Sequence, residues 1–352
     1  MGFYQAMQLS AANLKPLIKN AESKEIKNKY IAALILKSIL CLLFCTIVVI
    51  SFGKVFGEEN NVVGVVTVIS LLTFRFSNLD FKVRQAALTI VGIFGVLSIS
   101  PYIASISNPF LGFIINFISI IGILILTCHN VRLCNHSIFV LSYFLLYGYK
   151  VENTEILINR IIGLIFGGIL VASIFYIKQR KIEFKNTFID IINDVDFNTE
   201  RTKWQLKFAF VTTSAIMIGE FLHIPRAMWI GIACMSVFHP DKSQLQIRYK
   251  QRMLYMVLGC LMYMSIYFLI PQQFRGLIGL IGGVMIGFSG TYKWQTVFNA
   301  FGALSAATPI LGVGGAIIFR ILNNVFGALY SKGFDYIINF IDNKEFTNVN
   351  EA

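Results

Sequence analysis

Long apolar runs dominate this sequence and recur from Ile31 to Tyr330. A helix needs about 20 apolar residues to cross a hydrocarbon core that is about 30 Å thick, and these runs approach or reach that length. Only 14% of the residues are charged, whereas soluble globular proteins average about 25%. The chain is therefore expected to fold in a lipid bilayer.

The runs are continuously apolar, which predicts helices, because the strands of a membrane barrel would alternate apolar and polar residues. The expected spans in the first half are 30–52, 60–75, 86–106, 110–127, 134–149 and 155–177. Those in the second half are 207–224, 227–239, 252–270, 275–290, 294–310 and 313–330. The predicted fold class is an all-α integral membrane protein with about twelve transmembrane helices.

The two halves share a pattern of basic residues and glycines. Arg160-Ile-Ile-Gly-Leu-Ile-Phe-Gly167 in the sixth span matches Arg320-Ile-Leu-Asn-Asn-Val-Phe-Gly327 in the twelfth. Further matches are Lys82-Val-Arg84 with Lys250-Gln-Arg252, Gly92 with Gly259, and Leu36-Lys37 with Leu206-Lys207. Six spans in each half give both copies the same orientation, so the sequence predicts a parallel 6+6 internal repeat.

Basic residues orient the spans, since Lys and Arg in short loops stay mostly on the cytoplasmic side. Only Lys54, Lys150, Arg226 and Arg275 fall in loops on the other side. We therefore expect a multi-pass protein of the plasma membrane with both termini cytoplasmic. The expected parts are a cytoplasmic amphipathic N-terminal segment (1–29), the first membrane repeat (30–177), a cytoplasmic connector (178–206), the second membrane repeat (207–330) and a cytoplasmic tail (331–352).

The net charge of +12 follows from this topology and does not predict nucleic-acid binding, because the basic residues do not form one tract or polar face. The basic loops are expected to contact anionic lipid at the cytoplasmic face of the bilayer. Recruitment of an anionic substrate by the same loops is the alternative. In the connector, apolar residues between Ile182 and Val195 could form one amphipathic helix at the inner surface.

One motif in the second half resembles a known family. Trp229-Ile-Gly-Ile-Ala-Cys-Met-Ser-Val-Phe-His239-Pro240 is followed by Arg248, Lys250, Arg252 and Gly259. This stretch resembles the fusaric acid resistance family, which includes aromatic acid exporters, although His239 stands where that family is expected to have Gln. The resemblance implies export of aromatic or other carboxylate anions, and Trp229 is taken as a candidate substrate contact on that basis.

Two intramembrane arginines, Arg320 and Arg160, are the first candidates for substrate binding. A charge within a span is costly and usually faces a polar cavity or a partner. A guanidinium group binds a carboxylate in a planar, bidentate geometry, so arginines related by the repeat would surround one central anion site. The alternative for Arg160 is that its side chain reaches the outer interface.

Lys37 and Lys207 lie in the first span of each repeat, where their side chains could extend to the headgroups or line a vestibule that concentrates anions. Glu220, His223 and His239 are the titratable groups available for proton coupling, although a solvated structural role fits each of them.

No nucleotide-binding, protease or hydrolase motif appears, so we expect no enzyme and no cofactor. Cys128, His129, Cys134 and His136 match no strong ligand spacing, so no metal site is expected. The sequence therefore predicts an exporter of small organic anions. A passive organic-anion channel and a non-transporting scaffold for envelope biogenesis are the alternatives, and a homo-oligomer is compatible with any of the three.

Overall fold

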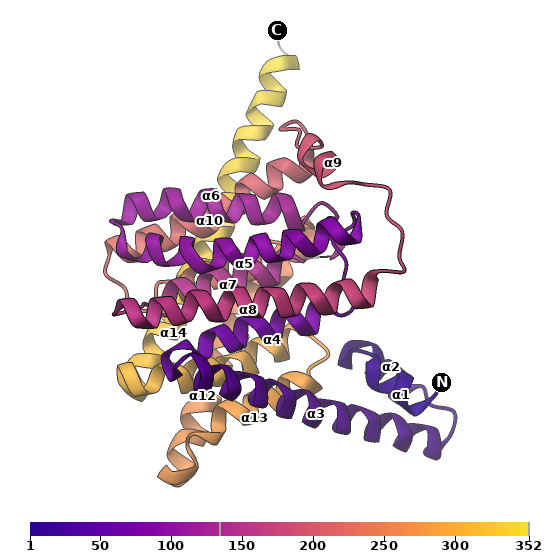
Figure 1. Ribbon diagram of the computed structural model, residues 1–352. Helices are drawn as coiled ribbons and strands as arrows, with labels where there is room; N and C mark the ends of the chain where they lie inside the picture. The colour runs from indigo at the N-terminus through magenta and orange to yellow at the C-terminus, as the bar shows by residue number, and fades with distance from the viewer. Residues whose placement is uncertain (134, 351–352) are drawn as a thin grey trace. The chain divides into compact units, whose positions relative to one another are not determined.

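The computed structural model describes residues 1–133 and 135–350, with the side chains of all these residues except 132, 242, 339 and 341–350. Every regular element in this part of the chain is a helix (Figure 1). The α-helices are α1 (Phe3–Gln8), α2 (Ala11–Lys19), α3 (Lys24–Phe56), α4 (Asn61–Phe74), α5 (Val83–Ile106), α6 (Pro109–Thr127), α7 (His136–Gly148), α8 (Thr154–Gln179), α9 (Phe188–Asn193), α10 (Glu200–Phe221), α11 (Met228–Val237), α12 (Lys242–Leu269), α13 (Leu277–Phe288) and α14 (Tyr292–Asn350). Short 3₁₀ turns lie at Glu58–Asn60, Val131–Leu133 and Gln272–Phe274.

The all-helical prediction is confirmed, and a helix occupies each of the twelve expected positions. Six helices are long and apolar enough to cross a membrane, namely α3, α5, α6, α8, α12 and α14. Four others, α4, α7, α11 and α13, have 14, 13, 10 and 12 residues. At a rise of 1.5 Å per residue they are only about 15–21 Å long, short of a core about 30 Å thick. The protein is a multi-pass membrane protein with long and short helices.

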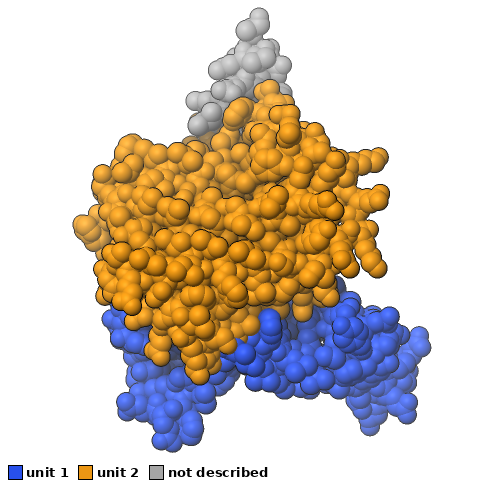
Figure 2. All heavy atoms as spheres, in the orientation of Figure 1, with its two compact units in different colours: residues 1–47, 246–325 blue, residues 48–245, 326–352 orange. Residues whose placement is uncertain are grey.

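Two compact units divide the chain, and each draws helices from both predicted repeats (Figure 2). Unit 1 consists of residues 1–47 and 246–325, and unit 2 consists of residues 48–245 and 326–352. The five-part division made from the sequence remains a prediction.

Unit 2 is built around α7, which packs against α4, α5, α6 and α11. The longer helices pair around it, α5 with α8 and α6 with α10 (Figure 1). Phe139 of α7 stacks on Phe74 with ring centroids 5.0 Å apart and meets Phe94 edge-on at 6.4 Å. Lipid is as apolar as these rings, so tight packing rather than escape from water holds the helices together.

Small residues allow α8 to approach its neighbours. A Cβ atom on Gly168 would lie 2.7 Å from the Cβ of Phe94, and one on Gly167 would collide with the Thr67 side chain. Distances this short are not tolerated, so glycine is required for α8 to pack on α4 and α5.

In unit 1 the N-terminal helices fold against α3. Ala6, Leu14 and Leu34 form a buried cluster with Phe288 of α13 packed beside it. The α13 helix also lies close to α3, since a Cβ on Gly287 would stand 2.9 Å from Ser38 Oγ and one on Gly283 would stand 2.8 Å from Leu42 Cδ1. The amphipathic N-terminal segment is therefore anchored on the membrane helices of this unit.

The connector does not form a single helix. Only the six residues of α9 are helical between Gln179 and Glu200. The Asp190 side chain accepts hydrogen bonds from the Thr187 backbone N–H (2.7 Å) and hydroxyl (2.8 Å), which cap α9. These bonds, the backbone one most strongly, hold the pKa of Asp190 below its usual value. The preceding loop is tied to α5, because the Lys82 N–H donates to the Asn186 carbonyl at 2.9 Å.

A kink at Gly312 divides α14, with φ of 67° and ψ of 163°. This conformation is essentially restricted to glycine and costs other residues about 1–3 kcal/mol. The kink falls in the gap between the expected spans 294–310 and 313–330.

We expect Gly312→Ala to lower the thermal unfolding midpoint of the detergent-solubilised protein by several degrees. Nothing lies within 4 Å of a Cβ built at Gly312, so the loss would come from the backbone alone. Gly314→Ala is the matched control, because its Cβ also meets nothing and alanine favours a helix by about 1 kcal/mol over glycine. Equal midpoints for the two variants would contradict the assignment.

Candidate functional site

Three arginines are buried in the described part of the protein. Arg160, Arg252 and Arg320 are each 4% exposed, and no Asp or Glu side chain is buried among the residues that the structure describes. A buried cation is stable only where hydrogen bonds or an opposite charge compensate it. The three arginines therefore mark the places where this protein could stabilise an anion.

Arg252 and Arg320 lie together in unit 1. The Asn324 side-chain oxygen accepts hydrogen bonds from Arg252 Nε at 3.0 Å and Nη2 at 2.7 Å. The Asn324 amide nitrogen donates to the backbone carbonyl of Arg320 at 2.7 Å. Asn324 is fully buried, so its amide has exchanged water for these partners. We call these three residues the arginine cluster.

The arginine cluster is well inside the membrane helices. Arg252 lies ten residues from the start of α12 and seventeen from its end, or about 15 and 26 Å. Both arginines act electrostatically on the buried thiol of Cys260, two turns further along α12. The Tyr263 hydroxyl, near Cys260, lies 3.2 Å from the Thr308 hydroxyl of α14. Polar groups thus line the contact between α12 and α14.

The chemistry of arginine makes the arginine cluster suitable for binding a carboxylate. A guanidinium group carries five N–H donors in a planar fork, so pairing with one amide oxygen leaves donors for a carboxylate. At low dielectric such charge-assisted bonds are stronger than in water. The arginine cluster has the chemistry to hold an organic anion.

Arg160 has a different environment, in unit 2. Its Nε donates to Asn60 Oδ1 at 3.0 Å, and its Nη atoms donate to the carbonyls of Tyr149 (2.5 Å) and Glu59 (3.4 Å). These acceptors lie in the loops before α4 and α8, so the side chain joins two loops at one end of the unit. Substrate binding by Arg160 remains a proposal.

The remaining candidates are dispersed. The Lys37 ammonium donates to the Leu9 carbonyl, which joins α3 to the N-terminal helices. Lys207 is half-buried in α10, and Trp229 is buried at the start of α11.

The titratable candidates lie at two ends of the short helix α11. Glu220 and His223 precede it, with Glu220 3.9 Å from Lys150 and His223 exposed at a φ of 50°. His239 follows it and accepts from the Asp241 N–H at 3.1 Å. The Ser243 hydroxyl and backbone lower the pKa of Asp241, with the side-chain bond first. The helix α11 thus separates Glu220 and His223 from His239 along the chain.

The cysteines and histidines near residue 130 divide in two. Cys128 Sγ lies 3.2 Å from His136 Nδ1, whereas His129 lies 3.1 Å from Arg201 and 3.6 Å from Asp194. Cys134 is outside the described residues. Wherever side chains are described, no group of three or more potential ligands could hold a metal ion.

Sequence reasoning missed Arg252 and Asn324 as site residues. The expected span 252–270 places Arg252 at a helix end, because the apolar run begins there. The helix α12 starts ten residues earlier. The available signal was the pair Asn323-Asn324, since two adjacent amides inside an apolar span need buried partners.

A protein-family model matches the part of the chain that holds the arginine cluster. Residues 214–331, 118 of the 352 residues, match the family model described as fusaric acid resistance protein-like. This stretch is similar to the fusaric acid resistance-like proteins. Arg252, Arg320 and Asn324 all lie within it, and the predicted resemblance is confirmed there. The family consists of membrane transporters of the efflux type. No curated protein and no solved structure matches the chain.

We expect Asn60→Ala to destabilise the protein. Asn60 is 1% exposed and bonds Arg160 as well as the carbonyls of Phe56 (2.8 Å) and Ile156 (3.1 Å). Loss of this amide leaves a buried cation poorly compensated, at a cost of about 3 kcal/mol. The monomer peak after heating, in size-exclusion chromatography, measures the effect.

Asn61→Ala is the matched control, because this neighbour is exposed. Asn60→Asp should retain much of the stability, since its carboxylate still accepts from Arg160. Equal survival of Asn60→Ala and Asn61→Ala would show that the contact with Arg160 contributes nothing.

Proposed function

We propose that this protein exports small organic anions of the aromatic carboxylate type across the plasma membrane. The observation that carries the proposal is the arginine cluster, in which Asn324 accepts from the buried Arg252 guanidinium and donates to the backbone carbonyl of Arg320, itself a buried arginine. The cluster lies in the stretch that matches the fusaric acid resistance protein-like family model. Arg320 and Arg252 bind the carboxylate, and Arg160, in the other unit, is a separate candidate for anion binding.

The physical reason is the cost of moving a carboxylate out of water. An isolated charge is strongly disfavoured at low dielectric, and fixed cations offset that cost. The aromatic part of the substrate requires apolar, planar contacts. Tyr263 of α12 and Phe301 of α14 provide them. Both residues are buried, with ring centroids 6.0 Å apart, on the two helices that carry the arginine cluster.

Reciprocal packing supports the parallel repeat. In unit 1 the first helix of the first repeat, α3, packs on the fourth helix of the second, α13. In unit 2 the first helix of the second repeat, α10, packs on the fourth helix of the first, α6. Gln205 of α10 donates to the α6 carbonyl of Leu124 at 3.3 Å. If the two repeats exchange their first helices in this way, the contact of α3 with α13 and the contact of α10 with α6 are equivalent.

The short helices also support a transporter. Non-helical backbone at membrane depth is tolerated only where protein or a cavity covers it, and discontinuous helices commonly form the binding sites of transporters. The kink at Gly312 separates α14 into segments 292–311 and 313–338, which are about 30 and 39 Å long at 1.5 Å per residue. These features are compatible with twelve helices, several of which would not cross alone.

Anion flux tests the proposal directly. We expect Arg252→Gln, Arg320→Gln and Asn324→Ala to reduce benzoate efflux from proteoliposomes about tenfold or more, since one charge-assisted bond contributes about 1.5–3 kcal/mol. Lys250→Gln is the matched control, because this exposed residue lies two positions before Arg252 and its loss changes the charge equally.

Thermal midpoints must accompany the flux measurements, so that unfolding is not mistaken for a lost site. Arg252→Lys retains the charge without the planar fork and should lower flux less than Arg252→Gln. Folded variants with unchanged flux would contradict the site. Efflux that depends on an imposed proton gradient supports an exporter. Flux down the benzoate gradient in the absence of a proton gradient would instead support a passive anion channel.

Contacts between loops support the predicted division of the loops between the two sides of the membrane. Arg226 donates to the Gly148 carbonyl at 3.4 Å, so two predicted outer loops lie together, and His129 beside Arg201 joins two predicted inner ones.

We expect a cysteine at Glu152, an exposed outer position, to react with a membrane-impermeant maleimide in intact cells. A cysteine at Lys185, exposed in the connector, should react only after permeabilisation. The wild-type protein sets the background from native cysteines. The reverse pattern would invert the topology.

A further inference from the structure

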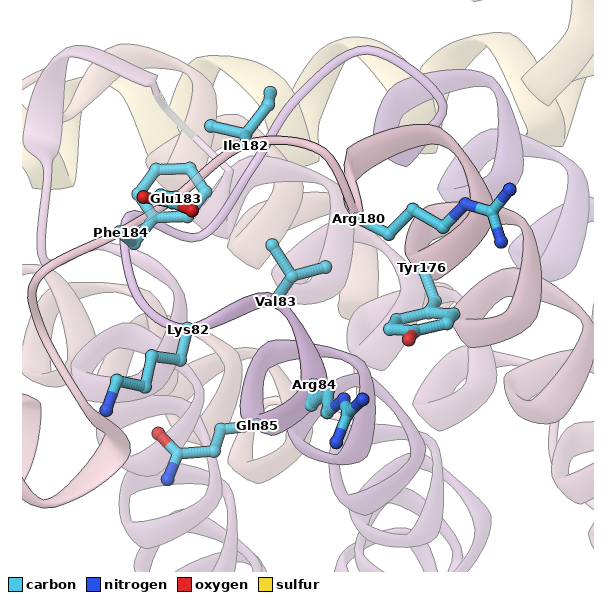
Figure 3. Close-up of a pocket in the computed structure, with 9 residues that line it drawn as sticks. All are labelled: Lys82, Val83, Arg84, Gln85, Tyr176, Arg180, Ile182, Glu183 and Phe184. Carbon is cyan, nitrogen blue, oxygen red and sulfur yellow. The ribbon is translucent and has the colours of Figure 1, made fainter.

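A basic pocket lies between the N-terminal end of α5 and the C-terminal end of α8 (Figure 3). It encloses about 560 Å³ within unit 2, and its polar wall includes Lys82, Arg84, Arg180 and the single acid Glu183. The loop after α8 closes one side, and it is fixed by the bond from Lys82 N–H to Asn186 and by the Phe188 N–H, which donates to Gln85 Oε1 at 2.8 Å. The pocket is therefore a built feature of the fold.

The charge in this pocket is unbalanced. Asp190 acts on Lys82, so that cation is partly compensated. Among the described residues no salt bridge joins Arg84 or Arg180 to an acid. Figure 3 shows the ring of Tyr176 between these two arginine side chains. Two guanidinium groups on either side of an aromatic hydroxyl suit a phosphate group.

An apolar groove of about 400 Å³ adjoins the pocket and shares Arg84 and Tyr176 with it. It runs along α5 and α8, lined by Leu88, Val91 and Ile169 among others. Leu88 is 72% exposed and Ile169 is 52% exposed. Both helices are candidate membrane spans, so this groove faces acyl chains and not water.

The internal repeat explains why Arg84 is free to take this role. By the sequence match, Arg84 corresponds to Arg252, and Leu164 corresponds to Asn324. Leu164 is fully buried and offers no acceptor. Arg84 is accordingly exposed, whereas Arg252 is held inside by Asn324.

We propose that this pocket and groove bind one anionic phospholipid, with its phosphate between Arg84 and Arg180 and one acyl chain along the groove. The occupant is a lipid because the basic pocket and the apolar groove are continuous at a membrane-exposed face. The pocket lies at the end of α5 and α8 that is predicted to be cytoplasmic, the leaflet in which anionic lipids bind basic residues.

A photoactivatable phosphatidylglycerol, reconstituted with the protein in phosphatidylcholine nanodiscs, tests this proposal. Mass spectrometry of the crosslinked peptides should locate the label on α5 and α8. Arg84→Gln/Arg180→Gln should reduce labelling there about tenfold or more. The matched control is Lys178→Gln/Lys185→Gln, which removes the same charge from exposed positions that do not line the pocket, and it should change labelling less than twofold.

A second variant tests the groove separately. Ser173→Trp would fill it at an exposed position and should also reduce labelling, with the arginines intact. Equal labelling in both double variants would overturn the site. Equally strong labelling by a photoactivatable phosphatidylcholine, or complete displacement by millimolar glycerol phosphate, would overturn the anionic lipid as its occupant, the latter in favour of a soluble anion.

Discussion

The contact between Arg252 and Asn324 is the interaction on which the interior of unit 1 depends. It joins α12 to the part of α14 that follows the kink, and both partners are almost completely buried. The amide oxygen accepts twice, and the amide nitrogen donates to the Arg320 carbonyl one turn earlier in α14. Because one residue satisfies a cation and also binds its own helix, the charge of Arg252 is fixed in position. A fixed charge suits the proposed anion site, since a preorganised cation requires no rearrangement to stabilise an anion.

The membrane imposes a second constraint, because apolar burial does little to hold helices together in lipid. Close helix contacts at glycines take its place. Gly168 lets α8 reach Phe94, and Gly287 lets α13 reach Ser38. Short helices such as α7, which packs against four other helices, gain stability from this close packing and do not need to cross the bilayer themselves.

The sequence was sufficient to predict where the helices lie, because hydropathy responds directly to the bilayer. It was less informative about helix ends. The first ten residues of α12 are mostly polar, so hydropathy does not predict them as helix. For the same reason it places Arg252 at a helix end and not inside the helix. The connector has apolar spacing compatible with a helix, yet the Thr187–Asp190 cap and the bond from Lys82 to Asn186 hold it in another form. The Arg160 side chain donates to backbone carbonyls of two loops that are far apart in the sequence. Every residue has a backbone carbonyl, so the sequence does not predict which ones accept these bonds.

The sequence match pairs Arg252 with Arg84 and Asn324 with Leu164, and the two arginines differ in burial. Arg252, which bonds Asn324, is buried, whereas Arg84 is exposed. An arginine without an internal acceptor cannot remain inside an apolar helix pair, because the cost of burying it exceeds the packing that it gains. The predicted repeat therefore has two matching positions, one with its cation inside the helices and the other with its cation at the surface. A difference of one matched side chain, Asn324 against Leu164, accompanies this difference in burial.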